Sequence, residues 1–196
     1  MTAYATKCIR RLGGRRAART TFAIGAVSLG LVALSACDKP GPHASFTVGT
    51  STESHEAADD CWDDGEPLGA ERAQSCVESE DGVPVISVET GDTFRVGVDP
   101  EIADTGWLIF YQGQPYEAEP YTTTYETFAV DDLYQVMRQQ SPGQVPERDT
   151  LRIVVAQVSE DYDMEEIWSS SSQEEYQEKL FGSFEGVWNL ELEPQD

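Results

Sequence analysis

Apolar and polar residues alternate with a period of two along most of the chain, which is typical of half-buried β-strands. Near the C-terminus, Trp188, Leu190 and Leu192 alternate with asparagine and glutamate. The run at 107–111 is apolar on both faces, as expected of a central strand. The run at 151–158 is rich in β-branched residues, which favours a further strand. The pattern predicts about seven short strands separated by turns.

The same pattern predicts how some of these strands are joined. The runs at 85–88 and 93–98 flank Glu-Thr-Gly-Asp, so they are predicted to form a β-hairpin with a glycine-containing turn. Residues 121–125 alternate in the strand that follows, and Asp131 is the expected N-cap of one short helix. The apolar residues that share one face of this helix, at spacings of three and four, are Leu133, Val136 and Met137.

Acidic, polar stretches interrupt the strand pattern at 59–82 and 159–180. The second holds few apolar groups to offset the entropy of ordering it, so it is expected to form a mobile loop or a short solvated helix. Residues 44–196 are therefore predicted to form an all-β, mainly antiparallel domain. We expect an immunoglobulin-like β-sandwich of about seven strands with one short helix, in which Trp107 is the buried central-strand tryptophan.

The N-terminus changes the picture of where this domain resides. Residues 1–36 lack acidic side chains, and all their basic residues precede an apolar run at 22–36, which is the layout of a secretory signal. Spanning a bilayer takes roughly 20 apolar residues, and this run is shorter, although an uncleaved signal anchor is the alternative. The run ends in four residues that resemble the lipobox of bacterial lipoproteins: Leu34, Ser35, Ala36 and Cys37.

The lipobox resemblance implies that the signal is removed and that Cys37 carries a covalent diacylglycerol. No other cofactor is expected. Residues 37–43 contain two prolines and are expected to form a flexible, extended tether. The protein is then anchored to the outer face of the bacterial cytoplasmic membrane. General secretion is the favoured export route and twin-arginine export is the alternative, because neither arginine pair of the signal is followed by the expected bulky apolar pair.

Charge restricts the partners of the exported domain. The signal contains six of the chain's 13 basic residues, so removing it leaves seven basic against 36 acidic side chains, a net charge of −29. Such a surface repels nucleic acid phosphates. The expected partners are the membrane, through the lipid anchor, and an envelope protein or glycan.

Cysteine usage agrees with an exported protein. With Cys8 removed and Cys37 acylated, Cys61 and Cys76 remain as one pair, which an oxidising exterior favours as a disulfide. It closes a loop of about 15 residues and stabilises the fold by about 3 kcal/mol. A zinc site is the alternative, but no further cysteine or nearby histidine pair completes four ligands. The bridge is expected within the 59–82 loop.

The acidic loop also suggests a cation site. Read as a twelve-residue calcium loop, it has Asp60 at position one, Asp64 at position five and Glu71 at position twelve. Trp62 takes position three, where an oxygen ligand belongs. An acidic solvated loop is the simpler interpretation, and divalent-cation binding is the alternative function.

Aromatic side chains offer another mode of binding. Flat faces for a sugar or peptide are candidates at Trp62, Tyr111, Tyr116, Tyr121 and Tyr125. Aromatic residues in strands more often pack in the core with a polar tip reaching water.

Catalysis has little support in the sequence. A catalytic site needs a base near a nucleophile, and the two histidines, His43 and His55, lie in the tether and in a polar stretch. No phosphate loop, nucleophile elbow or paired metal-ligand histidine motif occurs. We therefore expect a non-catalytic binding or interaction module of the cell envelope.

One stretch has a family resemblance. Residues 96–107, Val-Gly-Val-Asp-Pro-Glu-Ile-Ala-Asp-Thr-Gly-Trp, with the lipobox before them and the cysteine pair between, resemble an actinobacterial lipoprotein family classed only as a domain of unknown function. The resemblance implies an envelope location and no activity.

Overall fold

The computed structural model describes residues 40–111, 114–140 and 150–195, with the side chains of 137–140 left out. The signal, the lipobox with Cys37 and the first part of the tether lie outside these residues. Within them the chain is mainly strand, in two sheets, which confirms the mainly-β prediction. The helices and strands are β1 (His43–Val48), β2 (Ser51–Glu56), α1 (Ala70–Glu78), β3 (Val85–Val88), β4 (Thr93–Val98), α2 (Pro100–Thr105), β5 (Trp107–Tyr111), β6 (Gln114–Pro115), β7 (Tyr125–Ala129), α3 (Val130–Gln140), β8 (Leu151–Val158), α4 (Met164–Trp168), α5 (Gln173–Gly182) and β9 (Phe184–Pro194).

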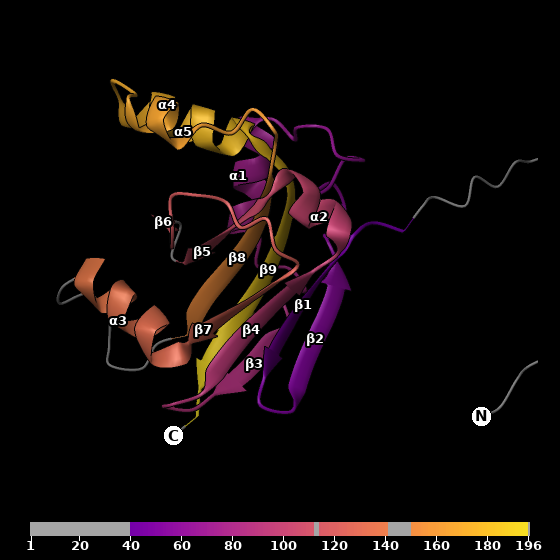
Figure 1. Cartoon of the computed structure of the whole chain (residues 1–196), viewed down its shortest axis with the longest axis vertical. Helices are drawn as coiled ribbons and strands as arrows, with labels where there is room; N and C mark the ends of the chain where they lie inside the picture. The colour runs from indigo at the N-terminus through magenta and orange to yellow at the C-terminus, as the bar shows by residue number, and fades with distance from the viewer. Residues whose placement is uncertain (1–39, 112–113, 141–149, 196) are drawn as a thin grey trace, which may run out of the picture. The chain divides into compact units, whose positions relative to one another are not determined.

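The first sheet has four strands in the order β2-β1-β4-β7, and all its neighbours are antiparallel. The second has five strands in the order β3-β9-β8-β5-β6. Its neighbours are antiparallel except β3, which runs parallel to β9. In Figure 1, α4 and α5 lie together at one end of the molecule, and α3 lies beside β7.

The hydrophobic core is divided by the five-stranded sheet. One cluster joins inward residues of both sheets, among them Phe46, Phe94, Trp107 and Trp188. The other lies on the opposite face of β5, β8 and β9 and contains apolar residues of α1, α4 and α5. Burial on both faces explains why β5 and β8 are almost continuously apolar.

Trp107 is fully buried, as predicted, and its Nε1 donates to the backbone oxygen of Thr123. The predicted helix after Ala129 is also present as α3, with Leu133 buried. It begins at Val130, so Asp131 lies inside its first turn rather than at the N-cap. In the described part of the chain, no helix is long and apolar enough to cross a membrane.

The predicted hairpin between 85–88 and 93–98 is wrong. The turn itself forms, since Asp92 N–H donates to the Glu89 oxygen and Asp92 Oδ2 accepts from Glu89 N–H. The two strands enter different sheets, however: β3 pairs with β9 and β4 with β1 and β7. A local turn changes the direction of the chain but does not determine which strands pair beyond it.

The expected mobile loop or single solvated helix at 159–180 is replaced by two short helices. Asp163 caps α4 through Oδ1, and Ser172 caps α5 through Oγ. Both helices bury a few apolar side chains against β5, β8 and β9, which orders the segment despite its charge: Met164, Ile167, Leu180 and Phe181.

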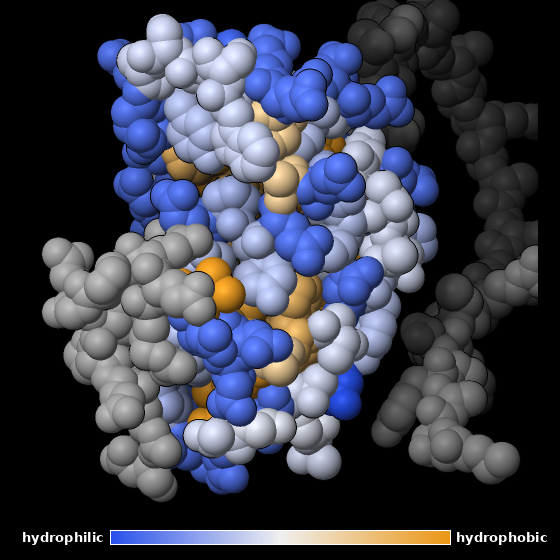
Figure 2. Space-filling view, turned by 60° about the vertical axis from the view of Figure 1, so that its left-hand side comes forward, coloured by the Kyte–Doolittle hydropathy of each residue, from blue (hydrophilic) through white to orange (hydrophobic). Residues whose placement is uncertain are grey.

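Other boundaries also differ from the predictions. The 59–82 stretch contains α1, so Cys76 is helical. His43, assigned to the tether, opens β1. Strand β7 begins only at Tyr125, and Tyr121 forms an isolated bridge with Trp107. Figure 2 shows one face of the domain, where hydrophilic side chains predominate and hydrophobic ones appear in small separate areas.

Candidate binding cleft

A cleft of about 250 Å³ opens beside β9. It lies at the edge of β9 opposite β8, where no described strand pairs with Asn189. On this edge Val187 N–H donates to the Cys61 oxygen and Glu191 N–H to the Pro84 oxygen, and β3 begins only opposite Glu191. The gap lies at Asn189. The cleft is lined by residues from three distant segments of the chain: Glu53, His55, Glu56, Ala58, Ser79, Asp81, Gly82, Val83, Pro84, Val187 and Asn189.

Asn189 is the most deeply buried polar residue of this cleft, with 9% of its surface exposed. Its Nδ2 donates to the backbone oxygen of Cys76 at 2.8 Å. Because a carbonyl oxygen only accepts hydrogen bonds, this contact determines which end of the amide is nitrogen. Oδ1 is buried and has no partner among the described residues. An unpaired buried acceptor costs about 1–3 kcal/mol, so the site favours a donor.

His55 contributes a second polar group to the cleft. It lies opposite Ala44 in the β1–β2 register, and its ring stacks on Phe46 at 5.5 Å. Burial lowers the pKa of His55, while a backbone hydrogen bond with Asn189 and the charge of Glu53 act in the opposite direction. The lowered pKa favours the neutral imidazole, and its buried Nδ1 has no partner within the described chain.

The remaining lining combines acidic and apolar side chains. Glu53, Glu56 and Asp81 supply carboxylates, while Val83, Pro84 and Val187 supply apolar contacts. No lysine or arginine occurs among the described residues that line the cleft. The resulting potential is negative, which attracts cations and repels anions.

The disulfide between Cys61 and Cys76 is present as predicted, with a Cα–Cα distance of 5.6 Å. It ties the segment before Trp62 to α1. Both of its residues also contact β9 through their backbone oxygens, which accept from Val187 N–H and Asn189 Nδ2. The bridge therefore positions one side of the cleft rather than closing a free loop.

The acidic loop next to the disulfide already holds an internal cation. Arg72 Nη1 lies 2.8 Å from Asp63 Oδ2, its Nε donates to the Asp60 oxygen, and its Nη2 lies 3.5 Å from the Trp62 oxygen. The positive charge of the Arg72 side chain within the loop disfavours a calcium ion beside it. No group of three or more His, Cys, Asp or Glu side chains suited to a metal occurs in the described chain. The predicted ligands Asp60, Asp64 and Glu71 are thus not assembled as a set.

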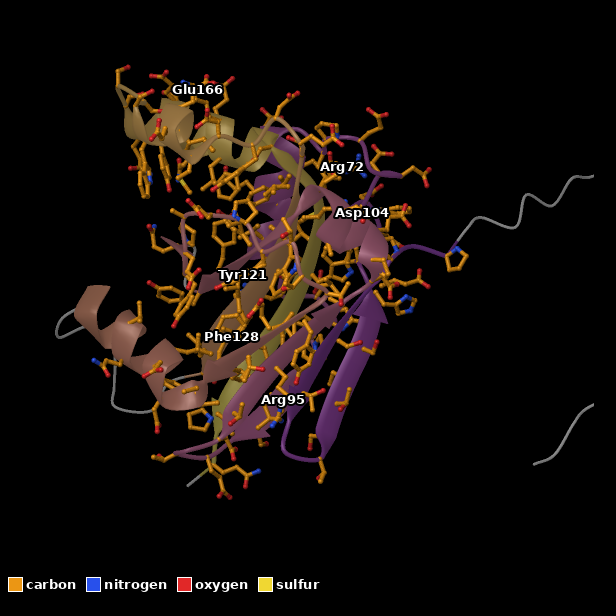
Figure 3. The ribbon with its side chains drawn as sticks, viewed as in Figure 1. Arg72, Arg95, Asp104, Tyr121, Phe128 and Glu166 are labelled. Atoms are coloured by element: carbon orange, nitrogen blue, oxygen red, sulfur yellow. A yellow bond between two sulfur atoms is a disulfide. The ribbon has the colours of Figure 1, made fainter. Side chains whose placement is uncertain are left out.

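The predicted aromatic residues do not share one exposed face. Tyr111 is buried at 1% exposure, which corrects its assignment as a ligand-facing ring. Tyr116 and Tyr121 are half-buried and pack edge-on against Phe128, Tyr121 at 6.0 Å (Figure 3). Trp62 is also half-buried and packs against the core. Tyr111, Tyr116 and Tyr121 therefore behave mainly as core residues, whereas Tyr125 is 53% exposed.

A separate buried carboxyl group lies at the start of β9. Glu185 is 6% exposed, and its Oε2 lies 3.2 Å from Gln157 Nε2 and 3.4 Å from Thr105 Oγ1. Burial raises the pKa of Glu185, which the hydrogen bond from Thr105 partly opposes. This group does not line the cleft.

The sequence did not indicate the cleft, because Asn189 and His55 belong to no recognisable binding motif. Asn189 occupies an outward position in the alternation of β9, and His55 lies in a polar stretch. Comparison with known proteins found no matching family model, no matching curated protein and no matching solved structure. The resemblance to the actinobacterial lipoprotein family therefore stays a prediction.

Proposed function

We propose that the chain is a membrane-anchored extracytoplasmic lipoprotein that acts as a non-catalytic binding or interaction module of the cell envelope. The observation that carries this proposal is the cleft beside β9, with a buried acceptor on Asn189 that no described residue satisfies. Binding sites are typically concave, with apolar walls and a few placed polar groups. The cleft has both features.

The fold proposed for this module is an immunoglobulin-like β-sandwich. Two sheets share a core cluster that includes Phe46 and Phe94 from one and Trp107 and Trp188 from the other, which supports face-to-face packing. Antiparallel pairing dominates both sheets, as in sandwich domains.

The anchor is proposed from the signal and the lipobox. Mass spectrometry of protein from the membrane fraction should find a lipid-modified Cys37 as its first residue. Cys37→Ser should release or mislocalise the chain. Recovery of mature protein that retains residues 1–36 would contradict the anchor.

In-cell photo-cross-linking tests the binding role. A photoreactive residue replaces Glu56, which is exposed on the cleft rim, and a matched variant carries it at Glu89, which is exposed in the β3–β4 turn. A binding module should yield one or a few discrete products from position 56 that are absent from position 89. The same products at both positions, or none at position 56, would overturn the proposal.

A further inference from the structure

We propose that the cleft beside β9 recognises a primary ammonium group carried on a short aliphatic stem, such as a lysine side chain. This inference rests on the proposed binding function and names the chemistry of the ligand.

The buried polar atoms of the cleft point to a hydrogen-bond donor. Asn189 Oδ1 is oriented by the bond from Nδ2 to the Cys76 oxygen, so it can only accept. The lowered pKa of His55 favours its neutral form, and the buried Nδ1 of its ring also lacks a partner in the described chain. An ammonium group has three donors and no acceptor. It therefore supplies a donor for each of these two acceptors and still has one N–H group for water or the rim.

Charge separates this ligand from neutral donors such as a hydroxyl group. Glu53, Glu56 and Asp81 line the cleft, and of these three only Glu56 forms an ion pair with a described residue, at 3.8 Å from His43 outside the cleft. These carboxylates raise the local concentration of cations. Charge-assisted hydrogen bonds are also roughly twice as strong as neutral ones. An anion would meet both repulsion and unpaired acceptors.

The size and apolar lining of the cleft favour a ligand with an aliphatic stem over a bare ammonium ion. At about 250 Å³, the cleft is slightly smaller than typical sites for drug-sized ligands, so it accommodates a single side chain. Ala58, Val83, Pro84 and Val187 provide apolar contacts for methylene groups. A quaternary ammonium has no N–H to satisfy Asn189, which distinguishes a primary amine from a choline-type headgroup.

The test uses the full chain, isotope-labelled and purified from membranes in a maltoside detergent. The readout is the NMR signal of the Asn189 side-chain amide during titration with three probes. Nα-acetyl-lysine methylamide carries the primary ammonium, its norleucine counterpart carries the same stem without charge, and its trimethyl-lysine counterpart keeps the charge without N–H groups. The proposal expects a saturable shift with the lysine probe, at least tenfold weaker binding of the other two, and competition by free butylammonium.

Variants separate the roles of charge and hydrogen bonding. Glu53→Gln with Asp81→Asn should weaken lysine-probe binding about tenfold or more, whereas Glu174→Gln with Glu178→Gln removes the same charge from the exposed face of α5 and should leave it unchanged. His55→Phe preserves an aromatic ring beside Phe46 and removes the Nδ1 acceptor, so it should also weaken binding. Asn189 is left intact because its Nδ2 bond supports the fold.

The possible results distinguish failure of the ammonium assignment from failure of the proposed binding function. Equal binding of the lysine and norleucine probes would overturn the ammonium assignment while leaving the cleft as a binding site. Equal loss in both charge pairs would show nonspecific attraction to an acidic protein and would also overturn it. No saturable shift with any probe refutes the inference, and the proposed function is then decided by cross-linking at position 56.

Discussion

Among the described glycines, Gly186 is the one at which an added Cβ would make the shortest contacts. An added Cβ would lie 2.6 Å from Cη2 and 2.9 Å from Cζ3 of Trp188, and 3.1 Å from Cδ1 of Trp62. Real contacts to a Cβ essentially never fall below 3.0 Å. Trp188 is 1% exposed, and its Nε1 donates to the Pro42 oxygen at 3.2 Å, so the ring has little room to move away.

The expected loss follows from these contacts. Forcing an extra methyl group into a packed core costs about 1–3 kcal/mol. Displacing Trp188 also weakens its hydrogen bond to Pro42, which contributes about 1 kcal/mol. Gly186→Ala should therefore lower the free energy of unfolding by about 2–4 kcal/mol. At about 2–4 °C per kcal/mol for a chain of this size, Tm should fall by roughly 4–16 °C.

Urea denaturation and calorimetry of the full chain measure this loss, with Gly182→Ala as the matched control. A Cβ at Gly182, the last residue of α5, meets no heavy atom within 4 Å. That variant should be neutral or more stable by up to about 1 kcal/mol, because alanine is the better helix former. Trp188→Phe in the Gly186→Ala background removes the atoms that clash, so the two losses should be less than additive. An unchanged Tm in Gly186→Ala would refute the reasoning.

Other predictions concern the bridge, the core, the buried acid and the acidic loop. Replacing both Cys61 and Cys76 with alanine should lower stability by about 3 kcal/mol, measured by urea denaturation, and reduction of the wild-type protein should have the same effect; no change on reduction would contradict a structural role. Trp107→Ala should cost about 3–5 kcal/mol, whereas an unchanged denaturation midpoint would place that side chain at the surface. Because burial raises the pKa of Glu185, its stabilising contribution is present below the ordinary pKa of glutamate and is lost as pH rises through the folded-state pKa. Glu185→Gln should therefore raise Tm at pH 7 and change it less at pH 4, and an equal effect at both would count against this assignment. Millimolar calcium should shift the wild-type Tm little, because the positively charged Arg72 side chain lies within the acidic loop, and Arg72→Gln should enlarge the shift in line with RT ln(1 + [L]/Kd); identical shifts in both proteins would exclude an effect of the Arg72 charge.

The sequence predicted strands best where burial is complete. The apolar runs at 107–111 and 151–158 coincide with β5 and β8, because both strands are covered on two faces. It missed β2, whose Ser-Thr-Glu-Ser-His-Glu sequence is mostly exposed and becomes a strand only through its pairing with β1. Local composition does not contain that information.

The cleft could not be predicted from the sequence either, because it also depends on contacts between distant segments. Its lining comes from residues 53–58, 79–84 and 187–189, which are brought together by strand order and by the Cys61–Cys76 bridge. No short motif spans such separations. The acidic loop, in contrast, was visible as a charge cluster, but the arginine that neutralises part of it became evident only from its contacts.

The contacts of Gly41 and Pro42 show where the folded domain begins. A Cβ on Gly41 would lie 3.3 Å from Trp62, and the Pro42 oxygen accepts from Trp188, so the folded body starts only a few residues after Cys37. At about 3.5 Å per residue, a fully extended segment from Cys37 to Gly41 would span on the order of 15 Å. This distance is about twice the Debye screening length in physiological salt. A lipid on Cys37 would thus keep this acidic domain close to the bilayer, where it would contact ligands at the membrane surface.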